Sequence, residues 1–434
     1  MHDFRYVRGS LHCEGSSVET LARRFGTPLF VYSQHTLEEH YARLDRALAP
    51  LDHLICYAAK ANSNLAVLGT FAHLGSGFDV VSAGELGRVI AAGGHPGRCV
   101  FAGVAKTVEE IEFALRKGIH CFNAESEPEL ERINRVASNL KTRAPVAVRV
   151  NPNVDARTHA KITTGTYQNK FGIALEAVEG VYARAAKLKH LHLRGVQMHI
   201  GSQLTTVGPF REAVGRVAPL AARLKERHGI EFFSIGGGIG IIYDAALASG
   251  DPQWWCSKAA RSVLTPASYA DALIPTLRPL GLRVLLEPGR FLVGNAGILV
   301  TRIEYVKLTG RKRFVIVDAA MNDLIRPAFY DAYHEIVPVR RRAGATVKSD
   351  VVGGICESGD YFAKDRPLAK VGEGELLALL SAGAYGSVMG SNYNSRPLAA
   401  EVLVRGKQAA LVRERQPVTE IWRGECLAGW QRSR

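Results

Sequence analysis

The sequence predicts an α/β fold, in which a (β/α)₈ TIM barrel is joined to an antiparallel β-sandwich or β-barrel domain. Three observations predict it. Eight short β-rich runs alternate with helical stretches along the first two thirds of the chain. Each run ends in polar or glycine residues, as barrel strands do where chemistry collects. From about residue 295 the helical stretches give way to alternating β segments.

The eight runs are the predicted barrel strands. In order they read "HLICYAAK", "GFDVVS", "RCVFAG", "IHCFNA", "PVAVRVNP", "LRGVQMHIGS", "EFFSIGGG" and "LRVLLEPGR". A doubly wound open sheet is the alternative, but such sheets more commonly have roughly five to seven strands. We therefore expect a closed barrel over residues 36–294.

Helices are predicted between these strands. The clearest segments are "SAGELGRVIAAG", "TVEEIEFALRKG" and "SEPELERINRVASN", and the last opens with an N-cap serine followed by early glutamates. The longer intervals 151–175 and 239–270 are expected to be loop excursions on the side where the strands exit. The second interval contains an unpatterned tract, 241–268, to which no role is assigned.

The remaining segments predict the β domain. They are "GILVTRIEYVKLTGRKRFVIVDA", "ATVKSDVVGGIC", "GELLALLSAGAYG" and "AAEVLVRGKQAALVR". The N-terminal "TPLFVYS" has the same character and is expected to join them. The second domain is thus predicted to comprise residues 1–35 and 295–434.

Composition and charge exclude several classes of protein. The chain has 434 residues, of which 47% are hydrophobic and 22% charged, values typical of a globular enzyme. No apolar run reaches the roughly 18 residues that span a bilayer, and the start lacks the apolar region of a signal peptide. We expect a cytoplasmic protein without a membrane partner. The net charge of +14 is scattered rather than clustered, so nucleic-acid binding is not expected.

The seven cysteines are widely spread and include no CxxC pair, which argues against a disulfide framework and a zinc ribbon. Most are expected to be buried thiols. Cys356, in "GGICESGDYF", is the exception, because it lies among polar and glycine residues where a thiol could meet a ligand.

The residues at the predicted strand ends are the candidate site. They include an amine, an imidazole, a triple-glycine turn, a carboxylate and arginines, without the spacing of a metal site. The full set is Lys60, Asp79, Ser82, Lys106, Asn123, Glu125, Arg149, Asn151, His199, Ser202, Gly236, Gly237, Gly238, Glu287 and Arg290.

Lys60 gains meaning from this company. A glycine turn such as "SIGGGIG" lets backbone N–H groups approach a phosphate, although a tight barrel turn explains it equally well. A lysine beside a phosphate cradle is what pyridoxal 5′-phosphate (PLP) needs for its imine link. Desolvation would lower the pKa of Lys60, and Glu287 could keep the pyridine nitrogen protonated. Taken alone, Lys60 could be a surface lysine and His199 a structural histidine.

Several motifs together resemble the diaminopimelate decarboxylases, of the alanine racemase-like (fold type III) family of PLP-dependent decarboxylases. They occur in order along nearly the whole chain: "YAAKAN", "FDVVSAGEL", "NKFGI", "HIGSQ", "GGGIG", "EPGRF", "DAAMNDLIRPAFY" and "CESGD". Single motifs are shared with ornithine and arginine decarboxylases, but the combined set is specific.

The resemblance implies a set of cofactor contacts. Lys60 would carry PLP, Asp79 would lie near it, and His199 would stack on the ring. Glu287 would pair with the pyridine nitrogen. The phosphate would be held by Ser202, Gly236, Gly237, Gly238 and Tyr385, and Gly289 and Arg290 would also contact the cofactor.

The resemblance also implies how meso-2,6-diaminopimelate is recognised. Arg290 and Arg326 would grip the distal carboxylate, since a planar guanidinium can donate two hydrogen bonds to it. Arg326 could instead pair with Asp323 on the surface. The other implied substrate contacts are Tyr330, Glu357 and Tyr385, with Glu357 taking the distal ammonium.

The implied reaction removes carbon dioxide from this substrate and yields L-lysine, the last step of lysine biosynthesis. Cys356 would donate the replacing proton across the interface of a homodimer. A decarboxylase of another basic or carrier-bound amino acid, of the ornithine, arginine or lysine type, is the alternative. A racemase would need a second catalytic base and no distal carboxylate clamp, and a non-catalytic PLP-binding protein would lack the β domain and the substrate arginines.

Overall fold

The computed structural model describes residues 2–155 and 170–431. The chain folds as two compact units. The first is built mainly from Gln34–Ala296 and takes in Gly383–Tyr385. The second is built from Asp3–Ser33, Gly297–Ala382 and the chain from Gly386 onward. Most of the predicted excursion 151–175, with the first residue of "NKFGI", lies outside the described residues.

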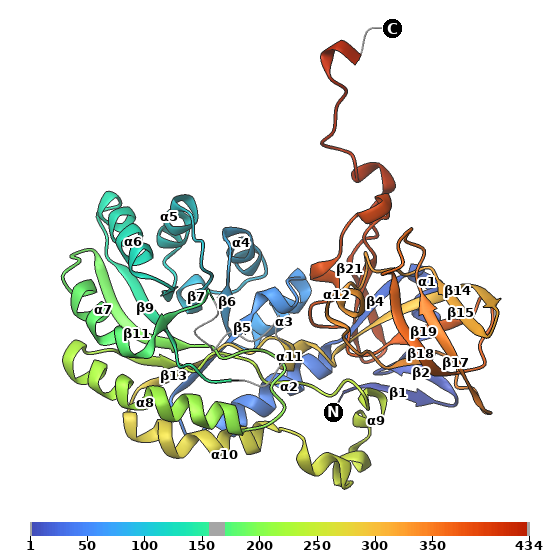
Figure 1. The fold of residues 1–434 in the computed structure, drawn as a ribbon, viewed down its shortest axis with the longest axis horizontal. Helices are drawn as coiled ribbons and strands as arrows, with labels where there is room; N and C mark the ends of the chain where they lie inside the picture. The colour runs from blue at the N-terminus through green and yellow to red at the C-terminus, as the bar shows by residue number, and fades with distance from the viewer. Residues whose placement is uncertain (1, 156–169, 432–434) are drawn as a thin grey trace. The chain divides into compact units, whose positions relative to one another are not determined.

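The first unit is a closed barrel of eight parallel strands (Figure 1). The strands are β5 (His53–Ala58), β6 (Gly77–Val80), β7 (Cys99–Phe101), β8 (Cys121–Ala124), β9 (Ala144–Asn151), β11 (Leu191–Met198), β12 (Phe232–Ser234) and β13 (Arg283–Leu286). Each pairs with its neighbour in this order, and β13 pairs with β5 to close the ring. A short strand, β10 (Ile173–Ala174), adds to β9. The predicted barrel is confirmed, and closure excludes the open sheet.

Helices surround these strands. They are α2 (Gln34–Leu48), α3 (Leu65–His73), α4 (Ala83–Ala91), α5 (Val108–Lys117), α6 (Glu127–Asn139), α7 (Val178–Ala185), α8 (Gly208–His228), α10 (Pro266–Leu277) and the short α11 (Arg290–Val293). The three predicted helices are confirmed as α4, α5 and α6. In α5 the sequence sets both ends: Thr107 and Glu110 form a capping box, and Gly118 ends the helix in the left-handed conformation.

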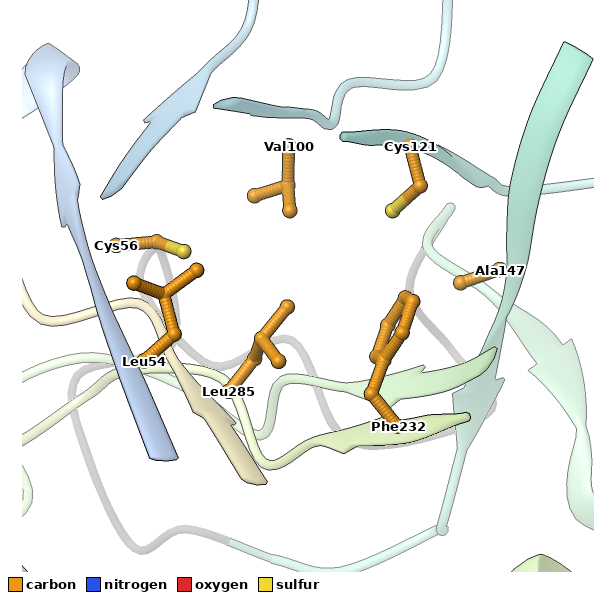
Figure 2. Close-up of a cluster of buried hydrophobic side chains, with 7 residues drawn as sticks. All are labelled: Leu54, Cys56, Val100, Cys121, Ala147, Phe232 and Leu285. Carbon is orange, nitrogen blue, oxygen red and sulfur yellow. The ribbon is translucent and has the colours of Figure 1, made fainter. Parts of the chain in front are cut away.

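Apolar side chains fill the barrel between its strands. Figure 2 shows Leu54, Cys56, Val100, Cys121, Ala147, Phe232 and Leu285 converging from six strands, and all are nearly inaccessible to solvent. Gly195 makes room for Phe232, because a Cβ there would clash with the phenyl ring. Burial of each larger side chain contributes roughly 1.5–3 kcal/mol. The barrel interior is thus a packed hydrophobic core, and the polar residues lie at the carboxyl ends of the strands.

The second unit is a mixed β domain. Its strands are β4 (Leu29–Ser33), β14 (Gly297–Thr309), β15 (Lys312–Val317), β16 (Ile336–Pro338), β17 (Thr346–Val352), β18 (Tyr361–Ala369), β19 (Leu376–Leu379), β20 (Ala400–Arg405) and β21 (Gln408–Arg413). Strands β1 (Phe4–Val7), β2 (Ser10–Cys13) and β3 (Ser16–Ser17) form a small separate sheet beside α1 (Val18–Phe25). The short helix α12 (Arg326–Tyr330) also belongs to this unit.

Most pairings in the larger sheet are antiparallel, as predicted, but two are parallel: β15 with β17 and β20 with β4. A purely antiparallel domain is therefore wrong in this detail. The physical reason is that alternation of apolar and polar residues reveals a strand but not the direction of its partner.

The unassigned tract 241–268 forms short turns, namely α9 (Ala246–Ser249), η5 (Pro252–Cys256) and η6 (Ala259–Ser262). Within the tract, Trp255 donates its indole N–H to the carbonyl of Ser249 at 2.8 Å. Over the described ranges, no helix combines the length and the apolar character that crossing a bilayer would require.

Candidate active site

The predicted site residues fall into two groups. The barrel unit contains Lys60, Asp79, His199, Ser202, Gly236, Gly237, Gly238, Glu287, Gly289, Arg290 and Tyr385. The β unit contains Arg326, Tyr330, Cys356 and Glu357.

Lys60 and Asp79 form an ion pair at the mouth of the barrel. Lys60 lies in η1 (Ala59–Ala61), directly after β5, and its Nζ is 2.6 Å from Oδ2 of Asp79 on β6. Asp79 is fully buried, and 39% of the Lys60 side chain remains exposed. The other oxygen of Asp79, Oδ1, is buried without a hydrogen-bond partner among the described residues.

The predicted lowering of the Lys60 pKa is wrong for the chain without a cofactor. Burial does lower this pKa, but the negative charges of Asp79, Tyr385 and Glu287 outweigh it, and the pKa is raised above its usual value. The error arose because the sequence showed the apolar surroundings of the amine but not the carboxylate that the neighbouring strand places against it.

Glu287 follows β13 and is 6% exposed. Its Oε1 accepts hydrogen bonds from Ser234 Oγ at 2.7 Å and Asn123 Nδ2 at 3.2 Å. Its Oε2 accepts one from Gln197 Nε2 at 2.8 Å. Burial, followed by the charge of Asp79, raises the pKa of Glu287 to about 7, although the bonds from Ser234 and Gln197 oppose the rise. Hydrogen bonds thus hold the carboxyl group in place, and its pKa lies close to neutral pH.

His199 follows β11 and presents a neutral imidazole. Its Nδ1 accepts a hydrogen bond from the backbone N–H of Gly237 at 3.1 Å, which leaves the ring proton on Nε2. Burial, with the positive charges of Arg149 and Lys60, lowers its pKa well below the usual value. A neutral, oriented ring is suited to stacking rather than to charge pairing.

The triple-glycine turn follows β12 and is required by close backbone packing. A Cβ on Gly236 would clash with the carbonyl of Met198, one on Gly237 with that of Glu287, and one on Gly238 with that of Gly201. Gly236 and Gly238 also have positive φ angles, of 70° and 110°. Barrel closure alone therefore explains the glycines, and a phosphate role rests on what lies beside them.

Arg290 follows β13, the next barrel strand after β12, and is the centre of a polar cluster. Its Nε and Nη2 donate to Ser202 Oγ at 3.4 and 3.1 Å, and its Nη1 donates to Tyr243 Oη at 2.6 Å. The Tyr385 ring centroid is 4.9 Å from the guanidinium carbon. Arg290 is 6% exposed, and a buried guanidinium surrounded by hydroxyls is suited to binding an anionic group.

Backbone contacts hold the walls of this cluster. The N–H of Tyr385 donates to the carbonyl of Ala61 at 2.8 Å, which ties the tyrosine to the segment next to Lys60. Tyr385 has a φ of 54°, an uncommon conformation for a tyrosine. Gly289 lies tightly against the same segment, since a Cβ on it would be 3.0 Å from that of Ala61.

Several other strand-end residues have structural partners. Lys106 Nζ is saturated by the carbonyls of Gly103 and Asn123 and by Glu129 at 2.6 Å. Arg149 pairs with Glu125 at 2.7 Å. These buried ion pairs brace β7, β8 and β9 and leave no free amine for chemistry. Ser82 caps α4, and Asn151 accepts the N–H of Asn153.

In the β unit, Arg326 and Tyr330 stand at the two ends of α12. Arg326 is 6% exposed, and its Nε donates to His334 Nε2 at 3.3 Å. Asp323 is 3% exposed and accepts the N–H of Ala320. The alternative of a surface pair between Arg326 and Asp323 is therefore wrong, because neither residue is at the surface.

Cys356 and Glu357 lie exposed on a loop of the β unit. The N–H of Cys356 donates to Asn394 Oδ1 at 3.0 Å. The side chain of Tyr393 is hydrogen-bonded to Glu357, which raises the tyrosine pKa. The segment around Asn394 thus holds the loop that presents the thiol and the carboxylate.

Three residues of the site were missed from sequence: Gln197, Ser234 and Tyr243. The first two carried a usable signal, because a polar side chain inside a buried parallel strand demands a partner. Tyr243 carried none, since the tract around it lacks a pattern. Within the part of the chain that the structure describes, no cluster of three or more metal-binding side chains occurs.

Comparisons with known proteins agree on one family. Residues 34–294 match the family model described as "Pyridoxal-dependent decarboxylase, pyridoxal binding domain". The diaminopimelate decarboxylases of Pseudomonas aeruginosa and Vibrio cholerae are 50% and 49% identical to the chain; each alignment covers 98% of the chain and 99% of the relative.

Solved structures agree with these relatives. A diaminopimelate decarboxylase from M. jannaschii in co-complex with L-lysine has a TM-score of 0.90 and 36% identity, covering 99% of both chains. One from Helicobacter pylori complexed with L-lysine has a TM-score of 0.87 and 38% identity, covering 93% of this chain and 98% of that one.

Proposed function

We propose that this chain, which belongs to the diaminopimelate decarboxylase family of pyridoxal-dependent decarboxylases, removes carbon dioxide from meso-2,6-diaminopimelate and yields L-lysine. One observation carries the proposal. The barrel brings a lysine amine, a buried carboxylate and an anion-seeking arginine to the carboxyl ends of its strands. These are the three groups that a PLP enzyme of this type requires.

The residues present fit the cofactor. When bound, PLP supplies a pyridinium ring that withdraws electrons from the substrate carbon losing its carboxylate. A buried oxygen of Asp79 has no hydrogen-bond donor among the described residues, and the guanidinium of Arg290 donates to the hydroxyls of Tyr243 and Ser202. A buried acceptor without a donor is costly unless a ligand completes it.

Lys60 is the residue we propose to carry the cofactor. Its amine is partly exposed at the strand end, as a nucleophile must be. Asp79 holds Nζ in one position and raises its pKa, so the amine is protonated in the absence of the cofactor. Replacing Lys60 with alanine is expected to abolish turnover and leave PLP loosely held.

The cofactor phosphate would be bound by Ser202, Arg290, Tyr385 and the turn Gly236–Gly238, with Gly289 allowing the close approach. Support comes from the hydrogen bonds and the ring contact that already join Arg290 to Ser202 and Tyr385. His199 would lie against the ring face, since its imidazole is neutral and oriented. Glu287 would hold a proton at the pyridine nitrogen.

For the substrate, we propose that Arg290 and Arg326 bind the distal carboxylate, with Tyr330 and Tyr385 adding hydroxyls. Glu357 would bind the distal ammonium, and the Cys356 thiol would donate the proton that replaces carbon dioxide. Cys356 and Glu357 are exposed on one loop, which makes them available to a second subunit. We therefore propose a homodimer whose active site uses residues of both chains.

Complementation tests this shared site. Lys60→Ala and Cys356→Ala proteins, each nearly inactive, are mixed under conditions that exchange subunits. Random pairing makes half of the dimers mixed, and each mixed dimer has one intact site, so about a quarter of wild-type activity is expected. Activity that stays at the level of the separate variants would contradict the shared site.

The substrate proposal is tested by measuring carbon dioxide release from meso-diaminopimelate, lysine, ornithine and arginine. We expect release from the first alone. Turnover of another amino acid without the first would replace the substrate. The cofactor is tested on the same preparation, which should be yellow and should be fixed onto Lys60 by borohydride. A protein that stays colourless with added PLP would refute the proposal.

We also propose that the enzyme works in the cytoplasm. All seven cysteines are free thiols, which agrees with a reducing compartment. Locating the tagged protein by cell fractionation checks this directly.

A further inference from the structure

The carboxylate of Glu287 is held by three neutral side chains from three other strands. Ser234 comes from β12, Gln197 from β11 and Asn123 from β8, with donor distances of 2.7, 2.8 and 3.2 Å. All three are almost fully buried. Such bonds to a charged acceptor are about twice as strong as neutral ones, so together they fix the carboxylate in one orientation.

Gln197 differs from the other two in making an incomplete set of bonds. It is 1% exposed, and its Oε1 is buried without a hydrogen-bond partner among the described residues. A buried amide oxygen in this state destabilises the fold, whereas a methionine of similar size would fill the space without that cost. The hydrogen bond to Glu287 is therefore what the Gln197 amide provides that an apolar side chain could not. The NH₂ end must face the carboxylate, since the oxygen would repel it.

The charged and titratable groups around Glu287 explain why a neutral hydrogen-bond donor suits this position. They are Asp79 on β6, Lys60 on η1, and the thiols of Cys56 on β5 and Cys121 on β8. Asp79 disfavours a second negative charge, and both thiols are kept neutral because burial raises their pKa values. A cation in place of Gln197 would neutralise Glu287 and compete with the ring nitrogen. A neutral donor stabilises the charge and leaves it available.

We propose that Gln197 is a positioning residue, whose amide N–H aims Glu287 and keeps it ionised for the ring nitrogen of the cofactor. This inference rests on the proposed function, because Glu287 needs a protonated ring to face. Gln197 would then influence the charge of Glu287 as well as forming part of strand β11.

The test uses holoenzyme in which Gln197 is replaced by methionine or by glutamate. Gln197→Met keeps the volume and removes the donor. Gln197→Glu keeps shape and hydrogen bonding but adds a carboxyl that must share a proton with Glu287. Asn322→Leu is the control, because Asn322 is a buried amide of the β unit whose side-chain atoms have no hydrogen-bond partner among the described residues.

The main readout is the absorbance of bound PLP, without substrate, as a function of pH. In Gln197→Met the spectral transition should move upward by about one pH unit, because the lost donor favours the protonated acid. Gln197→Glu should move it further. With meso-diaminopimelate, kcat of Gln197→Met should fall about tenfold with little change in KM, and its acid limb should shift in the same direction.

A purely structural role would change stability without moving either pH transition, as expected for Asn322→Leu. If Gln197→Met folds, binds PLP and has the wild-type transition, the inference is wrong. If Gln197→Met does not fold, Gln197→Glu decides the matter by the same criterion. Failure of the wild-type protein to bind PLP would instead refute the proposed function, so the two failures are distinguishable.

Discussion

Buried ionisable side chains at the strand ends set the chemistry at the scale of single residues. Lys60, Asp79 and Glu287 were candidate site residues from sequence, because each lies at or directly after the end of an apolar strand and has a side chain that is costly to bury. Their charge states could not be predicted, since these depend on which groups neighbouring strands bring within a few ångströms. Gln197 and Asp79 act on Glu287 in opposite directions, and only the fold reveals both.

Glu287 should make the cofactor-free protein less stable as pH rises. Its pKa is raised from 4.5 in the unfolded chain to about 7, so the folded state binds more protons between these values and stability falls with increasing pH. Glu287→Gln removes this effect. Above pH 7 the variant apoprotein should be more stable than the wild type by on the order of 2 kcal/mol, while decarboxylation falls.

Urea unfolding of both apoproteins at pH 5 and pH 8 checks this expectation. The difference between the two proteins should be small at pH 5 and large at pH 8. An equal difference at both values would show that Glu287 is ionised throughout this range in the folded chain.

Tyr243 should matter for cofactor affinity. Its hydroxyl accepts a 2.6 Å hydrogen bond from Arg290, the cation that we assign to the phosphate. Tyr243→Phe removes the bond but keeps the ring, so PLP should bind about tenfold more weakly, as expected for loss of one charged hydrogen bond. Titration of the apoprotein with PLP measures this change. Tyr305→Phe, at an exposed position of β14, is the control, and equal affinities would exclude Tyr243 from the site.

At the scale of elements, the strands and the best-capped helices were readable from sequence. Period, capping residues and glycine placement act locally, and α5 shows all three signals. The direction of strand pairing was not readable, because β4 and β20 pair across most of the chain length. Tyr243 could not be predicted for a related reason. Its tract has no periodic sequence pattern, and tertiary contacts determine its position.

The glycine turn after β12 gives a prediction at this scale. Gly237→Ala would push a Cβ against the carbonyl of Glu287, so it should destabilise the fold by roughly 1–3 kcal/mol and disturb Glu287. Gly215→Ala is the matched control within α8, where a new Cβ meets no atom within 4 Å. That change should stabilise the protein by up to about 1 kcal/mol. Thermal unfolding should show shifts of opposite sign, and a neutral Gly237→Ala would contradict the close packing.

At the scale of the whole molecule, each unit draws on distant parts of the chain. β4, from the N-terminal segment, lies between β14 and β20 and is buried along its full length. The sequence indicated that "TPLFVYS" belongs with the later β segments. It could not indicate the central position of this strand, because register and neighbours are decided by side chains on three strands at once.

Removal of residues 1–33 should therefore disrupt the β unit rather than trim its edge. The deletion exposes unpaired backbone groups of β14 and β20, and such edges promote aggregation. We expect loss of the cooperative unfolding transition of the β unit and a largely insoluble product, measured by solubility and near-UV circular dichroism. A deletion of residues 432–434 is the control. A soluble, cooperatively unfolding truncated protein would show that β4 is dispensable.

The return of Gly383–Tyr385 to the barrel unit also limits how this protein can be rearranged. The backbone of Tyr385 is bonded to Ala61, and the carbonyl of Gly383 accepts the side-chain amide of Asn62 at 3.1 Å. Excising 34–296 as a portable cassette would leave the lysine-bearing segment without these anchors. Gene fusion or domain shuffling would therefore have to move nearly the entire polypeptide, or graft a substitute for a tripeptide encoded almost a hundred codons downstream.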